Sequence, residues 1–155
     1  MTVPKRVRIL ACGSLDGGDD AVALLAAAGL PDAVRSAVEP VGQLGAEHLT
    51  DDQPDTVRIV VDCVAGLEPG EIVELPLAEL PAREAELQVA STHALPIGQA
   101  VALAASLGAL RAEDRFLGVG GASFGQGDPL SPVVQAALPE LRRRLAAAAS
   151  AAAAG

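Results

Sequence analysis

Two kinds of hydrophobic pattern alternate along the chain. Short runs rich in Val and Ile predict β-strands at residues 6–12, 33–41, 57–63, 71–75 and 116–119. The run VRIVVDC at 57–63 is apolar on both faces, as expected of a central strand that is covered from both sides. The run at 33–41 is weaker, because Pro40 lies near its end.

Between these runs, Ala- and Leu-rich stretches have the spacing of helices. They predict helices at 20–29 and 95–107, a short amphipathic turn at 44–49, and a last helix that begins at Pro132. Gly-Leu-Pro at 29–31 and Gly108 are typical stop signals, and Ser131 before Pro132 is a typical start. The low-complexity stretch 146–155 is expected to be the frayed end of the last helix.

Strands that alternate with helices predict an α/β fold, a three-layer αβα sandwich. We expect a mostly parallel, twisted sheet of about five strands, with helices on both faces and one antiparallel strand. The tight turn Glu68-Pro69-Gly70 predicts that the two strands flanking it form the antiparallel pair. Because no linker or internal repeat is evident, residues 1–155 are interpreted as one domain.

Composition narrows the classes of function. The formal net charge of −9 disfavours nucleic-acid binding, and the two aromatic residues, Phe116 and Phe124, offer little surface for stacking bases. Cys12 and Cys63 lie in apolar runs without disulfide spacing, which is typical of a reduced cytoplasmic protein. No apolar run approaches the ~20 residues that cross a membrane, so no membrane association is expected.

The loop after the first predicted strand is rich in glycine and acidic residues. It carries Asp16, Asp19 and Asp20 without Lys or Arg, so it favours a cation over a phosphate group. Asp19 is interpreted as a cap of the following helix. For Asp20 two interpretations remain open, a ligand to a cation or a favourable charge in the first helical turn.

Two further side chains extend the candidate site. Asp62 ends the central strand. A carboxylate there either has a structural role, accepting hydrogen bonds from loop amides, or belongs to a functional site. His93 directly precedes the helix expected at 95–107, whereas His48 is interpreted as a solvated residue. Asp20, Asp62 and His93 together would suit a borderline divalent ion such as nickel or zinc.

The motifs, in order, resemble the hydrogenase maturation proteases. A glycine-rich acidic motif follows the first strand, a strand ends in Asp before a Pro-Gly turn, and a Ser-Ser-His-like step enters a helix. A Leu-Ser-Pro-Val segment precedes the last helix. In this sequence the motifs are GSLDGGDDAVA at 13–23, Asp62 with Gly66 and Pro69-Gly70, Ser91-Thr92-His93, and LSPV at 130–133.

The resemblance implies an endopeptidase that removes the C-terminal extension of a nickel–iron hydrogenase large-subunit precursor. It also implies that Asp20, Asp62 and His93 bind nickel, or another divalent cation in its place, and that this nickel arrives with the precursor. Asp16 is a further candidate for positioning substrate or handling protons. The precursor is the expected partner, and the protein is expected to be a cytoplasmic monomer.

The glycine-rich segments also suggest where the substrate lies. Candidate substrate contacts are Gly13, Ser14, Gly120, Gly121 and Phe124, although the second segment could equally be a flexible surface loop. Ser14 replaces the usual Asn of the family motif, and two of its glycines are replaced by Ala21 and Ala23. These departures keep a second hypothesis open, a non-catalytic chaperone of the same fold that binds the precursor or its metal.

Overall fold

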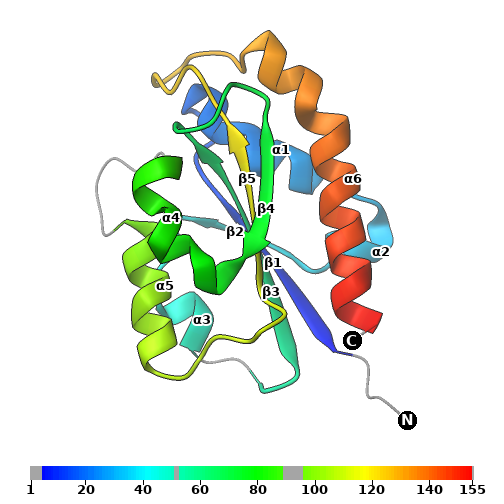
Figure 1. The fold of residues 1–155 in the computed structure, drawn as a ribbon. Helices are drawn as coiled ribbons and strands as arrows, with labels where there is room; N and C mark the ends of the chain where they lie inside the picture. The colour runs from blue at the N-terminus through cyan, green and yellow to red at the C-terminus, as the bar shows by residue number, and fades with distance from the viewer. Residues whose placement is uncertain (1–4, 51–52, 89–95, 155) are drawn as a thin grey trace.

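A mixed sheet organises the chain in the computed structural model, which describes residues 5–50, 53–88 and 96–154 (Figure 1). Within these residues the strand order is β2-β1-β3-β5-β4. Neighbouring strands are parallel from β2 to β5, and β4 pairs antiparallel with β5. The strands are β1 (Arg6–Cys12), β2 (Val38–Gly42), β3 (Thr56–Val64), β4 (Ile72–Pro76) and β5 (Arg115–Gly120).

Helices cover both faces of this sheet, which confirms the predicted αβα sandwich (Figure 1). One face packs against α1 (Val22–Ala28) and the long α6 (Pro132–Ala154). The other packs against α4 (Leu80–Leu87) and α5 (Ile97–Ser106), with Leu49 of the short α3 (Glu47–Thr50) in the same core. The remaining elements are η1 (Gly18–Ala21), α2 (Asp32–Arg35) and η2 (Leu77–Glu79).

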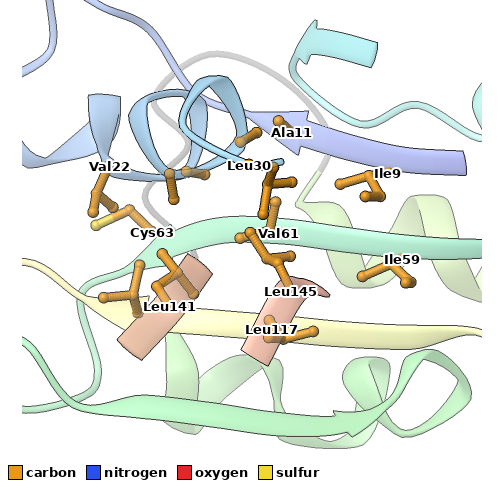
Figure 2. Packing of buried hydrophobic residues seen from close by; sticks show 14 of the residues in the cluster. Ile9, Ala11, Val22, Leu30, Ile59, Val61, Cys63, Leu117, Leu141 and Leu145 are labelled. Atoms are coloured by element: carbon orange, nitrogen blue, oxygen red, sulfur yellow. The ribbon is translucent and has the colours of Figure 1, made fainter. Parts of the chain in front are cut away.

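The alternation of side chains along the strands divides the core into two layers. Ile9 and Ala11 of β1 lie in the cluster beneath α1 and α6, whereas Leu10 and Cys12 lie in the cluster on the opposite face. Figure 2 shows the first cluster, in which Leu141 and Leu145 of α6 pack over the sheet. All nine residues of β3 are buried, as its apolar sequence predicts for a central strand.

A buried ion pair closes the amino-terminal edge of the sheet. Arg58 of β3 is fully buried, and its guanidinium donates to Asp114 at 2.7 Å and to the carbonyl oxygens of Leu49 and Ala109 at 2.9 and 2.7 Å. Asp114 also accepts the backbone N–H groups of Arg58 and Arg111. Such a pair is tolerated because hydrogen bonds replace the water that both charges lose.

The predicted pairing around the turn Glu68-Pro69-Gly70 is wrong. β4 is the antiparallel strand, but its partner is β5 rather than β3. The turn passes over the carboxyl end of β5, where Gly120 and Gly70 are linked by a 2.9 Å backbone hydrogen bond. A Cβ on Gly120 would overlap the carbonyl oxygen of Glu68, so the glycine lets the chain cross there.

Three further elements differ from expectation. Residues 32–35 form α2 and β2 begins only at Val38, because the carbonyl of Pro31 accepts the N–H groups of Val34 and Arg35. Helix α4 is absent from the sequence prediction, since its charged face weakens the apolar pattern. The expected frayed tail is instead helical to Ala154, where Ala149 is buried.

None of the helices in the described parts of the chain is long and apolar enough to cross a membrane.

Candidate functional site

The loops that follow β1, β2, β3 and β5 meet at the carboxyl edge of the parallel strands, where ligands bind in open α/β sheets. The backbone N–H of Gly13 donates to the carbonyl of Gly42 at 2.6 Å, which joins the first two loops. None of the residues 9–34, 36–57, 59–82 and 116–141 is Lys or Arg. These loops are therefore acidic without a balancing cation of their own.

Asp20 lies inside the turn that the first loop makes. Gly13 has a φ of +119°, and a Cβ there would overlap the carbonyl oxygen of Asp20, so glycine is required by both conformation and space. The N–H of Ser14 donates to Oδ2 of Asp20 at 3.0 Å. The other oxygen, Oδ1, is buried and has no hydrogen-bond partner among the described residues. Burial raises the pKa of Asp20 above its ordinary value, against the opposing bond from Ser14.

Asp62 lies beside Asp20, near the end of β3. Its side chain is on the same face of the sheet as Val60 and Val64, is only 7% exposed, and accepts the N–H of Cys63 at 2.8 Å. Burial and then the charge of Asp20 raise its pKa well above the ordinary value. The structure thus brings two of the three predicted ligands together, as a carboxyl pair whose charged forms repel each other.

Cys12 borders this pair. The register of β1 and β3, in which Ala11 faces Val61, places Cys12 next to Asp62. Burial, followed by the charges of Asp62 and Asp20, raises the pKa of its thiol well above the ordinary value. The thiol of Cys12 is therefore protonated at neutral pH and forms part of the wall of the site.

The third predicted ligand, His93, lies outside the described residues, as do Ser91 and Thr92. Within residues 5–50, 53–88 and 96–154, no three His, Cys, Asp or Glu side chains form a group that could hold a metal ion. Asp16 is exposed, and its carbonyl accepts the N–H of Gly127 at 2.6 Å. The roles assigned to His93 and Asp16 stay predictions.

Asp19 does not cap a helix, contrary to expectation. Its carboxylate is fully buried and accepts bonds of 2.7 to 3.0 Å from the N–H groups of Ala122, Ser123 and Ser131 and from the Ser131 hydroxyl. Burial alone raises the pKa of Asp19, but these bonds, led by Ser131, outweigh it and lower the pKa from its ordinary value. The carboxylate of Asp19 therefore holds loop 121–131 against η1, the element that also carries Asp20.

The predicted substrate contacts differ in accessibility. Ser14 is exposed and Gly13 partly exposed beside Asp20, whereas Gly120 and Gly121 are buried. A Cβ on Gly121 would crowd the sulfur of Cys63 and the ring of Phe124, which itself packs against the core beneath α1 and α6. Close packing explains the second glycine pair, and contact with substrate stays a prediction for all five residues.

Comparison with known proteins agrees with this architecture. The family model HycI, hydrogenase maturation protease, matches residues 29–148, a range that contains Asp62 and His93 and begins after Asp20. No curated protein sequence matches the chain.

Solved structures share the fold. The [NiFe] hydrogenase maturation protease HybD from Thermococcus kodakarensis has a TM-score of 0.71 and 23% identity, over 93% of this chain and 99% of that one. The hydrogenase maturating endopeptidase HybD from E. coli has a TM-score of 0.69 and 22% identity, over 92% and 91%. The maturation protease HycI from T. kodakarensis KOD1 has a TM-score of 0.58 and 20% identity, over 95% and 94%. At these identities the likeness shows the fold alone.

Proposed function

Because this chain belongs to the hydrogenase maturation protease family, we propose that it cleaves the C-terminal extension from a nickel-loaded nickel–iron hydrogenase large-subunit precursor. In this proposal Asp20, Asp62 and His93 bind the nickel that the precursor carries, and the scissile bond is held beside it. The nickel is part of the substrate rather than a resident cofactor.

The pair of carboxyl groups from Asp20 and Asp62 carries the proposal. Burial raises the pKa of both carboxyl groups, and the charge of Asp20 raises that of Asp62 further. Two such groups, in loops without Lys or Arg, form a site that a divalent cation would stabilise. Within the part of the chain that the structure describes, Oδ1 of Asp20 is a strong acceptor without a donor. Carboxylate oxygens together with one imidazole suit a borderline divalent ion.

Each residue has a distinct part in this proposal. Asp62, held by the N–H of Cys63, is the rigid member of the pair, because its strand is buried throughout. Asp20 is held by Ser14 through one oxygen and keeps the other for the cation. A divalent cation at such a site supplies Lewis acidity for hydrolysis of the nearby carbonyl group.

The test is cleavage of the nickel-loaded precursor from the same source, followed by intact mass. We expect catalytic amounts of the protein to release a C-terminal peptide from an excess of precursor. Stoichiometric binding without any loss of mass would support the chaperone hypothesis instead.

Variants assign the site within the same assay. His93→Ala and Asp62→Ala are expected to abolish cleavage while the far-UV circular dichroism stays native. His48→Ala is the matched control, because it removes the only other histidine and leaves the proposed ligands intact. Activity that survives both site variants would refute the ligand assignment.

The proposal also covers the setting of the reaction. Both cysteines are free and buried, in keeping with a cytoplasmic protein that has no need of disulfides. We propose that the protein acts there as a monomer, and size-exclusion chromatography with light scattering tests this directly.

A further inference from the structure

A groove of about 320 Å³ lies between the loop after β2 and the helix α5. Residues 43–47 line one side, and Ala100 and Leu103 of α5 line the other. Leu103 is 49% exposed, a large fraction for a leucine on a helix whose opposite face, with Val101 and Ala104, is buried. The volume is near the lower end of ligand pockets, which suits one or two side chains better than an organic cofactor.

This groove adjoins the carboxyl pair. Its first lining residue follows Gly42, whose carbonyl accepts the N–H of Gly13. The next, Leu44, has its backbone beside the side chain of Cys12, which in turn borders Asp62. A polypeptide with one bond at the carboxyl pair would therefore meet the groove a few residues away.

The chemistry of the lining selects an occupant. Residues 96–110 contain no charged side chain, and the lining contains a single ionisable one, the exposed Glu47. No Lys or Arg occurs between residues 36 and 57 to balance that carboxylate. The groove thus favours an apolar side chain, and Glu47 disfavours acidic residues next to it.

We propose that the groove binds an apolar side chain of the hydrogenase precursor close to the scissile bond, with the precursor in an extended conformation along α5. This inference rests on the proposed function, since it identifies how the same substrate is recognised. The groove is a specificity pocket whose occupant does not take part in bond cleavage. Its contacts are therefore equal in the ground state and in the transition state.

The test combines two groove variants with a control on the same helix. Leu103→Glu places a charge in the groove, and Ala46→Trp fills it from the opposite side. Leu107→Glu is the control, because Leu107 is 64% exposed one turn further along and does not line the groove. For each variant, the Kd for the purified nickel-loaded precursor is measured together with kcat and KM for its cleavage.

We expect both groove variants to raise Kd and KM by about tenfold or more, with kcat within about twofold of wild type. For the control Leu107→Glu, we expect Kd, KM and kcat each to stay within about twofold of wild type. A fall in kcat at unchanged KM, or an equal effect of Leu107→Glu, would overturn the proposal. So would a wild-type dimer that Leu103→Glu dissociates, because a second copy of the chain would then occupy the groove.

The experiment tests the groove proposal separately from the proposed cleavage of the precursor. If the wild-type protein binds the precursor without cutting it, the proposed cleavage fails and the ratio of Kd values alone decides the groove. Unchanged Kd values in both groove variants overturn the groove proposal even if cleavage by the wild type is efficient.

Discussion

The carboxylate of Asp19 accepts two hydrogen bonds from Ser131, 112 positions away in the chain. The backbone N–H reaches Oδ1 and the hydroxyl reaches Oδ2, each at 2.7 Å. Together with the bonds from Ala122 and Ser123, they tie the start of α6 and the glycine-rich loop to η1. The position of Asp20 therefore depends on the neighbouring carboxylate as well as on its own loop.

Asp19→Asn should be among the most destabilising single substitutions. The amide keeps the shape but offers one acceptor oxygen where the carboxylate offers two, so part-buried donors in loop 121–131 lose their partner. We expect a loss of about 2–4 kcal/mol in the free energy of unfolding, measured by urea denaturation. Asp16→Asn, an exposed change in the same loop, should stay within about 0.5 kcal/mol.

The lowered pKa of Asp19 also fixes the sign of a pH effect. Its stabilising contribution is present above the pKa of the unfolded chain and is lost as the pH falls through the lower folded value. Wild type should therefore lose stability on acidification more steeply than Asp19→Asn. Parallel acid-unfolding curves for the two proteins would contradict this assignment.

Asp62→Asn should stabilise the protein while removing its proposed function. Because the folded pKa of Asp62 is raised, its charged form weakens the fold at neutral pH. The amide oxygen can still accept the N–H of Cys63. We expect the melting temperature to rise by about 2 °C or more, with a gain that grows as the pH rises above the ordinary pKa of an Asp carboxyl. A variant less stable than wild type across this range would contradict the carboxyl-pair account.

Nickel provides the complementary measurement. Ni²⁺ should raise the melting temperature of wild type and leave Asp62→Asn unchanged, because ligand binding to the folded state stabilises it. The increment for wild type should shrink as the pH is lowered, since protons compete with the metal for both carboxylates. An equal increment in both proteins would place the metal elsewhere.

Gly13→Ala tests whether the loop around Asp20 must be built on glycine. Two costs add there, the φ of +119° and the overlap of a Cβ with the carbonyl oxygen of Asp20. We expect a loss of more than about 2 kcal/mol and weaker nickel binding. Gly127→Ala is the control, because Gly127 has a φ of +82° with open space around it. Its loss should be about 1–2 kcal/mol, from conformation alone.

The buried Arg58–Asp114 pair predicts strongly non-additive energetics. Arg58→Met leaves Asp114 charged without its partner, and a loss of about 3–5 kcal/mol is expected. Adding Asp114→Leu should recover part of this loss in urea denaturation, because the orphaned charge is gone. Additive losses in the double variant would show that the two side chains act independently.

The convergence of Asp20 and Asp62 could be predicted because it follows from general geometry. Asp20 follows β1 and Asp62 lies near the end of the parallel β3, and the carboxyl ends of such strands share one edge of a sheet. The pairing of β4 with β5 could not be predicted from the sequence. The turn at Pro69-Gly70 is compatible both with a hairpin and with a chain that crosses over β5. The role of Asp19 could not be predicted either, because its hydrogen-bond partners lie 103 to 112 positions away in the chain. Patterns in a single sequence report only on local neighbours. Helix α6 continues beyond residue 146, where fraying was expected, because the buried Ala149 packs against the core. This tertiary contact stabilises the last turns of the helix.

The unbalanced carboxylates at the carboxyl edge of the sheet give the molecule an electric dipole along its strands, with the negative end at that edge. Lys5 and Arg115, at the amino ends of β1 and β5, are balanced by ion pairs with Glu113 and Glu74, while the loops at the carboxyl ends carry carboxylates without Lys or Arg. A large partner with positive potential would be turned toward the carboxyl edge before any side chain touches it. Encounter would then slow as salt is added, whereas the lifetime of the bound complex, set by short-range contacts, would change little.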